Sequence, residues 1–99
     1  MPNEKPLELC IPKVSSTISQ KKIFDTFCKL NIGYIERITE NPLYYHPEFK
    51  RVIIRVKWDN TNPLAKKIQD VLLENPTEHM NVVYDMPWYW QIYANNQKK

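Results

Sequence analysis

Residues 50–58 read KRVIIRVKW, and this stretch decides the fold class. Large apolar residues alternate with mostly basic ones, which is the period of two typical of a β-strand with one buried face. The side predicted to face the core holds Val52, Ile54, Val56 and Trp58. The opposite side holds Arg51, Ile53, Arg55 and Lys57. The sequence therefore predicts a strand that packs on one face and presents the other outward.

A strand and a helix are predicted upstream of this segment. Residues 7–14 alternate in the same way, and Thr17 with Gln20 matches the capping box that begins many helices. Apolar residues then recur at helical spacing as far as Leu30. Gly33 is the only glycine, and we expect it to end this helix in the left-handed conformation.

Between this helix and residue 50, a second strand and a loop are predicted. Residues 34–40 carry Ile35 and Ile38, whose three-residue spacing breaks the alternation and indicates a β-bulge. Residues 41–49 contain two prolines and predict a long, stiff connection rather than a tight hairpin.

Downstream, one further helix and two extended segments are predicted. Asn62 before Pro63 is a strong helix start, and Asn75-Pro76 is expected to stop that helix. Residues 80–84 form a fourth predicted strand, and residues 88–93 form an additional extended segment after a break at Pro87.

The predicted order is β-α-β-β-α-β, so we expect an α+β fold of the ferredoxin-like, RRM-like class. Right-handed crossovers place both helices on one face of a four-stranded antiparallel sheet and leave the other face free, with the C-terminal extended segment in addition. The predicted core consists of Leu9, Ile11, Phe24, Phe27, Val52, Ile54, Val56, Ile68, Val71 and Leu72.

Composition sets the class of protein. A chain of 99 residues with 42% hydrophobic residues can form one core, so residues 1–99 are expected to be a single domain with flexible ends at 1–6 and 95–99. No early stretch has the pattern of a signal peptide, and no window is apolar enough to span a membrane. A net charge of +3 is too small to identify a nucleic-acid binder by itself.

Catalysis and metal binding have little support in the sequence. Cys10, Cys28, His46 and His79 lie singly, without the clustered spacing that a tetrahedral zinc site needs. One glycine excludes the phosphate-binding motifs that require several, and no nucleophile motif is present. We therefore predict a protein that is not an enzyme, with no catalytic residue, metal, cofactor or small-molecule substrate.

The free sheet face has two competing interpretations. RNA-recognition motifs place aromatic rings where this chain has Cys10, Ile53 and Arg55, so base stacking in the usual way is lost. The basic residues form either a phosphate-binding stripe or merely the solvated side of a strand. The candidate phosphate-binding residues are Lys13, Arg51, Arg55 and Lys57.

Aromatic residues concentrate in residues 84–90, which read YDMPWYW. In one interpretation Trp88 and Trp90 cover the core, and in the other the rings anchor a partner protein. The candidate interface comprises Cys10, Ile53, Trp88, Tyr89, Trp90 and Tyr93. Tyr44, Tyr45 and His46 are candidate loop contacts.

Three segments carry a resemblance to a known family: LCIPKV at 9–14, LNIGYIERI at 30–38 and, most specifically, VVYDMPWYW at 82–90. With these the chain resembles, over nearly its whole length, the small RRM-like proteins of nucleocytoplasmic large DNA viruses of algae and amoebae. The resemblance implies a viral origin, a place in the virion or in the cytoplasm or nucleus of the infected cell, and no defined substrate. Where that family more often has Phe and His on the third strand, this chain has Ile53 and Arg55.

Two functions follow as hypotheses. The first is a non-enzymatic viral protein that self-associates, most simply as a homodimer, and acts as a virion or infected-cell factor. The alternative is a module that binds nucleic acid weakly and without sequence specificity through a basic sheet face. Salt separates the two hypotheses, because phosphate binding weakens steeply with added salt and a hydrophobic dimer does not.

Overall fold

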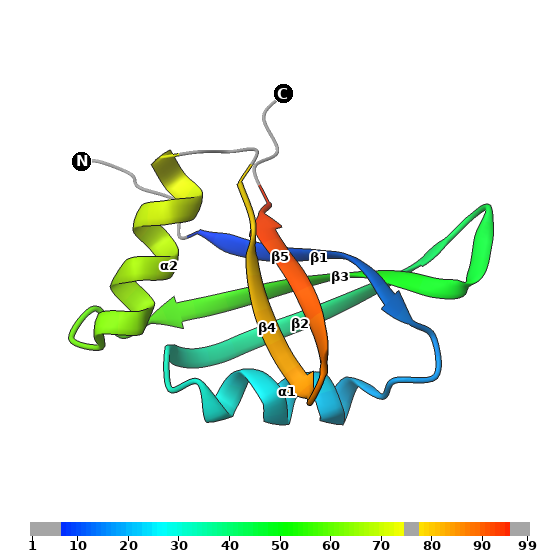
Figure 1. Cartoon of the computed structure of the whole chain (residues 1–99), viewed down its shortest axis with the longest axis horizontal. Coiled ribbons are helices and arrows are strands. Elements are labelled where there is room, and N and C mark those ends of the chain that lie inside the picture. The colour runs from blue at the N-terminus through cyan, green and yellow to red at the C-terminus, as the bar shows by residue number, and fades with distance from the viewer. Residues whose placement is uncertain (1–6, 75–77, 96–99) are drawn as a thin grey trace.

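A computed structural model of the chain describes residues 7–74 and 78–95. The elements follow in the order β1 (Glu8–Ser15), α1 (Gln20–Lys29), β2 (Gly33–Leu43), β3 (His46–Trp58), α2 (Pro63–Glu74), β4 (Met80–Asp85) and β5 (Trp88–Ala94) (Figure 1). The predicted stop at Asn75-Pro76 and most of the predicted flexible ends lie outside the described residues. Asn95 lies inside them, and its N–H donates a hydrogen bond to the carbonyl of Glu8 at 2.7 Å.

The sheet has five antiparallel strands in the order β2-β3-β1-β5-β4, so the prediction of four strands was wrong. The segment predicted as an added extension is β5, and it lies between β1 and β4. It pairs with β4 as a hairpin and with β1 through Leu9 and Cys10 only. Figure 1 shows this hairpin crossing the direction of β1, β2 and β3.

One hydrophobic cluster holds the two helices, the sheet and the hairpin together. Eight of the ten predicted core residues are buried, and Val71 packs against the cluster while partly exposed. Phe24 was wrongly predicted, because 43% of it is exposed. The inward stripe of α1 runs through Ile23 and Phe27, so Phe24 lies at its margin, where it lines a groove against β2. Trp90 and Ile92 bring β5 into the same core.

The two helices begin at different kinds of residue. The N-cap of α1 is Ser19, whose hydroxyl accepts a hydrogen bond from the Lys22 N–H at 3.1 Å, so the prediction of Thr17 was wrong. Thr17 instead hydrogen-bonds with Ser15. The predicted start of α2 is confirmed, because Asn62 Oδ1 accepts hydrogen bonds from two main-chain N–H groups of the first turn.

A turn containing an ionised side chain precedes α2. The hydroxyl and the N–H of Thr61 both donate to Asp59 Oδ1, at 2.6 and 3.1 Å. These hydrogen bonds lower the pKa of the Asp59 carboxyl below its usual value, because they favour the charged form.

The β2–β3 connection is a tight hairpin, so the prediction of a long loop over 41–49 was wrong. Leu43 pairs with His46, and only Tyr44 and Tyr45 form the turn. Pro42 is tolerated because β2 is an edge strand, where a missing N–H need not break a ladder. The predicted bulge in β2 is confirmed by the register shift between Ile35 and Arg37.

Gly33 does not cap α1 as predicted. The helix ends at Lys29, and the residue in the left-handed region is Asn31, with φ of 60°. Gly33 begins β2 with φ of 148°, where a Cβ would lie 2.2 Å from the carbonyl oxygen of Lys57. Its lack of a side chain therefore lets β2 start close against the end of β3.

We predict that Gly33→Ala destabilises the domain by more than about 2 kcal/mol, because the clash with backbone adds to an unfavourable φ. Urea unfolding followed by circular dichroism measures this loss. Asn31→Gly is the matched control, and at φ of 60° it should leave the unfolding midpoint unchanged or raise it slightly. Equal unfolding midpoints for Gly33→Ala and the unmodified protein would contradict the close approach of Gly33 to the main chain of β3.

Candidate binding surface

The β1–β5 ladder stops at Pro12. The Asn95 N–H donates to Glu8, which makes these two a hydrogen-bonded pair, and Cys10 with Tyr93 is the next such pair. The following pair would be Pro12 with Gln91. Proline has no N–H to donate, so this pair cannot form both of its bonds. The pairing of β1 with β5 accordingly ends at Cys10 and Tyr93.

A β-bulge at the same place turns β1 away from β5. Ile11 pairs with Val52 and Val14 with Lys50, so Pro12 and Lys13 together lie opposite the single residue Arg51. An extra residue in one strand bends that strand and increases its twist. Proline and bulge thus act together to separate the two strands beyond residue 11.

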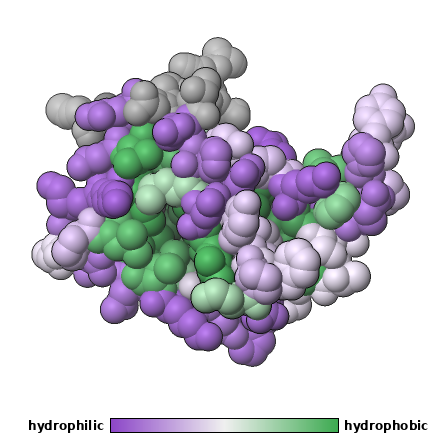
Figure 2. Space-filling model, viewed as in Figure 1, coloured by the Kyte–Doolittle hydropathy of each residue, from purple (hydrophilic) through white to green (hydrophobic). Residues whose placement is uncertain are grey.

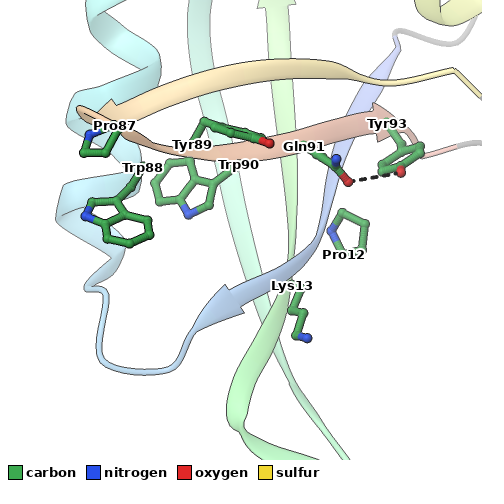
Figure 3. A pocket seen from close by; sticks show the side chains of 8 residues that line it. All are labelled: Pro12, Lys13, Pro87, Trp88, Tyr89, Trp90, Gln91 and Tyr93. Atoms are coloured by element: carbon green, nitrogen blue, oxygen red, sulfur yellow. Dashed lines mark hydrogen bonds between the residues drawn. The ribbon is translucent and has the colours of Figure 1, made fainter.

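The separated strands enclose a groove of about 630 Å³. Its lining comes from β1, from the β4–β5 turn and from β5: Pro12, Lys13, Pro87, Trp88, Tyr89, Trp90, Gln91 and Tyr93. Figure 3 shows β1 and β5 diverging, with Pro12 and Lys13 on one side and the rings of β5 on the other. The volume falls within the usual range of ligand-binding sites, and within residues 7–74 and 78–95 one charged side chain, Lys13, lines the groove.

The two tryptophans of β5 have different environments. Trp90 is 4% exposed and stacks on Tyr84 and Phe27, with ring centroids 4.2 and 6.2 Å apart. Trp88 is 63% exposed, and Tyr89 is 50% exposed. Of the predicted interface residues on this strand, Trp90 is therefore a core residue, whereas Trp88 and Tyr89 present their rings at the surface.

Two apolar residues extend this exposed surface, and sequence reasoning missed both. Val83 is 53% exposed and pairs directly with Tyr89, and Met86 in the turn is 79% exposed. We call Val83, Met86, Trp88 and Tyr89 the hairpin patch. The sequence did contain a signal for Val83, because Val82 and Val83 are adjacent and only one of them can face the core of a strand.

The remaining predicted interface residues lie together on the outward sheet face, where Ile53 and Tyr93 are partly exposed and Cys10 is buried. Ile53 of β3 pairs with Cys10 of β1, and Cys10 pairs with Tyr93 of β5. Residues directly opposite in a ladder point to the same side of the sheet. These three side chains therefore form one continuous row, in which Tyr93 also lines the groove.

The predicted phosphate-binding residues Arg51, Arg55 and Lys57 share the outward face of β3, and Lys13 lies on β1. The Nε of Arg55 lies 3.8 Å from Glu8 Oε2 and 3.7 Å from Glu36 Oε1, so carboxylates flank its charge. Lys57 lies opposite Tyr34, beyond Arg55 from the groove. Lys13 and Arg51 meet at the bulge beside the groove, where the Lys13 ammonium lies 4.4 Å from the centre of the Phe49 ring.

The predicted loop contacts lie apart from the groove. Tyr44 and Tyr45 form the β2–β3 turn, with their rings edge to face at 5.0 Å. His46 Nδ1 is 3.8 Å from Glu48 Oε2. Figure 1 shows this hairpin extending away from the rest of the molecule, and Figure 2 shows the same projection in outline. The structure does not bring these residues into the lining of the groove.

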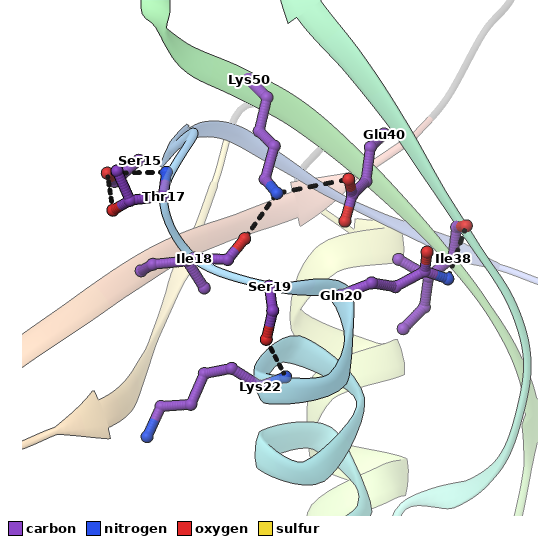
Figure 4. Close-up of polar contacts among 9 residues, drawn as sticks. All are labelled: Ser15, Thr17, Ile18, Ser19, Gln20, Lys22, Ile38, Glu40 and Lys50. Atoms are coloured by element: carbon purple, nitrogen blue, oxygen red, sulfur yellow. Dashed lines mark hydrogen bonds and ion pairs between the residues drawn. The ribbon is translucent and has the colours of Figure 1, made fainter.

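Lys50 links β3 to β2 through a partly buried ion pair and to the segment before α1 through a hydrogen bond. Lys50 Nζ lies 3.2 Å from Glu40 Oε1 and donates a hydrogen bond to the carbonyl of Ile18 (Figure 4). Glu40 Oε2 is buried and has no hydrogen-bond partner among the described residues. Because the Lys50 side chain contacts both β2 and the segment before α1, it holds these two parts of the chain to β3.

Neither described helix is long and apolar enough to cross a membrane. Within residues 7–74 and 78–95, no group of three or more His, Cys, Asp or Glu residues is placed to hold a metal ion. No known protein family, curated protein or solved structure matches the chain. The resemblance to RRM-like viral proteins stays a prediction.

Proposed function

We propose that the protein is a non-enzymatic interaction domain that self-associates as a homodimer. The observation that carries this proposal is the hairpin patch, whose four large apolar side chains are each at least half exposed. Large exposed apolar side chains that gather in one segment mark interaction sites, and Trp and Tyr are enriched where binding energy concentrates. A two-fold contact lets the same patch serve both partners.

The proposal includes a fold assignment and a setting. The fold is a variant of the ferredoxin-like, RRM-like arrangement. In that arrangement the fourth strand lies beside β1; here β5 lies beside β1, and β4 is added at the edge of the sheet. The VVYDMPWYW segment supports a viral origin and a role as a virion or infected-cell factor. In this structure that segment forms β4, the turn and the start of β5, the part of the molecule with the exposed rings.

We predict that Trp88→Ala raises the dimer dissociation constant by at least about tenfold, because a central ring at an interface contributes 2 kcal/mol or more. Sedimentation velocity over a concentration series measures the constant. Tyr44→Ala removes an even more exposed ring from the distant β2–β3 turn and should leave the constant unchanged. If both variants dimerise like the unmodified protein, the hairpin patch is not the interface.

A second candidate function, nucleic-acid binding, is favoured by one specific observation. Lys13 and Arg51 lie together at the bulge, next to the groove that Tyr89 and Tyr93 line. Single-stranded nucleic acids bind to surfaces that combine stacking rings with backbone-tracking cations. With Arg55 flanked by Glu8 and Glu36, however, few cations remain on this side of the sheet to contact phosphates.

We predict that the protein binds single-stranded RNA weakly and without sequence preference. Fluorescence anisotropy with a labelled mixed-sequence RNA, at about 50 and 200 mM salt, measures affinity and its salt dependence. Arg51→Ala should reduce any binding, whereas Lys66→Ala on α2 is the matched control and should not. Submicromolar, sequence-selective binding at 200 mM salt would replace self-association as the leading function.

A further inference from the structure

We propose that two copies of the chain join through the inner edge of β5, where the main chain of Tyr89 and Gln91 in one copy pairs antiparallel with the same residues of the other. This inference rests on the proposed self-association and specifies its geometry. Main-chain hydrogen bonds in the groove would form the contact, and the rings of the hairpin patch would cover these bonds.

The direction of the main-chain groups follows from the ladder. In an antiparallel strand, alternate residues direct their N–H and C=O to the same neighbour. Tyr93 faces β1, since Cys10 with Tyr93 is two residues along from the hydrogen-bonded pair of Glu8 with Asn95. Gln91 and Tyr89 therefore face the same way, into the gap that Pro12 opens, whereas Trp90 and Ile92 face β4.

This open edge lacks the usual protection. Natural proteins prevent strand edges from pairing with other chains by placing charges, prolines or bulges on them. Strand β2 at one edge of the sheet carries Glu36, Arg37 and Glu40. Strand β5 reads WYWQIYA and is the one strand of the five without a charged residue. Two copies of β5 can thus lie side by side without repulsion between like charges.

A second copy supplies matching main-chain groups by symmetry over residues 89–91, and the pairing ends before Tyr93, which is paired with Cys10. With a two-fold axis at Trp90, Tyr89 of each copy faces Gln91 of the other, and both are residues whose main-chain groups point into the gap. Each such pair can exchange two N–H to carbonyl bonds. The exposed Trp88 and Tyr89 rings then flank the added strand and exclude water from these bonds.

Charge argues against nucleic acid as the occupant of this edge. Among the described residues, Lys13 is the one charged side chain that lines the groove, and nucleic-acid affinity depends on neutralising many phosphates.

The experiment compares Gln91→Pro with Gln91→Ala in the full chain. Both variants remove the amide side chain, but only proline removes the N–H that the second copy needs. Because this N–H has no role in the β4 ladder, Gln91→Pro should retain its fold by circular dichroism. Sedimentation velocity should show the dimer dissociation constant raised at least about tenfold by Gln91→Pro and little changed by Gln91→Ala.

Amide hydrogen exchange provides a second measurement that does not depend on a variant. The Tyr89 and Gln91 amides of the unmodified protein should exchange slowly where the dimer predominates and become faster on dilution to monomer, whereas the Trp90 amide should remain slow throughout. If the protein dimerises but Gln91→Pro dimerises equally well, and the two amides exchange fast in the dimer, this pairing is wrong and the proposed self-association stands. If the intact protein is a monomer and a mixed-sequence RNA slows the two amides, both are wrong.

Discussion

Ile54→Asp should leave the chain without a cooperative unfolding transition. Ile54 is fully buried in β3, where it pairs with Leu9 of β1 and Ile38 of β2. An isolated carboxylate there has no counter-charge, and the cost of burying it exceeds the roughly 5–15 kcal/mol by which domains of this size are stable. Thermal unfolding followed by circular dichroism is the measurement.

Ile53→Asp is the matched control for this prediction, because it makes the same change one residue earlier on the free face of the same strand. Ile53 is partly exposed, and its partners Cys10 and Thr39 share that face. We expect this variant to unfold cooperatively with a modest loss of stability. A well-folded Ile54→Asp protein, or an unfolded Ile53→Asp protein, would mean that the register of β3 is wrong.

Trp90→Ala should destabilise the domain by about 3–5 kcal/mol, the cost of removing a large buried ring. Its ring is 4% exposed and stacks on Tyr84 and Phe27, so it joins the β4–β5 hairpin to α1. Urea unfolding at a protein concentration low enough to hold the chain as monomer gives the free energy of unfolding.

Trp88→Ala is the counterpart two residues away. Because Trp88 is 63% exposed, its removal should change the monomer's stability by less than about 1 kcal/mol while it weakens self-association. Equal losses of stability in the two variants would show that both rings belong to the core and that the hairpin patch is smaller than the structure indicates.

Local chemistry made several elements predictable from the sequence. Asn62-Pro63 combines a capping side chain with a ring pre-set for the first helical turn, and the structure has both contacts. The alternation of residues 50–58 correctly predicted which side of β3 faces the core. In a strand with one buried face, the apolar set of alternate residues must lie on the buried side.

Other features depended on competition between neighbouring residues, which a local pattern cannot resolve. Thr17 and Ser19 are both good N-caps, and in the structure Ser19 caps the helix while Thr17 hydrogen-bonds with Ser15. The prolines around Tyr44 and Tyr45 suggested a loop. An edge strand tolerates Pro42, however, and the two tyrosines form the turn of a tight hairpin.

The candidate site depended most on tertiary pairing. The sequence indicated that residues 84–90 hold an unusual density of rings, yet nothing local shows which tryptophan meets Phe27. The groove arises because β5 pairs with β1 and that pairing fails at Pro12, and strand order is not encoded in the pattern of either strand. Pro12 within a predicted strand was the one available signal, since proline in a strand marks an edge or a bulge.

Size-exclusion chromatography with light scattering on the intact protein tests the central claim of self-association most directly. At about 100 μM, and at both low and high salt, we expect a particle mass near twice the 11.9 kDa of the chain. Because the contact joins uncharged strands, added salt should not dissociate it. A mass near 11.9 kDa under both conditions would contradict self-association and the strand pairing through Tyr89 and Gln91.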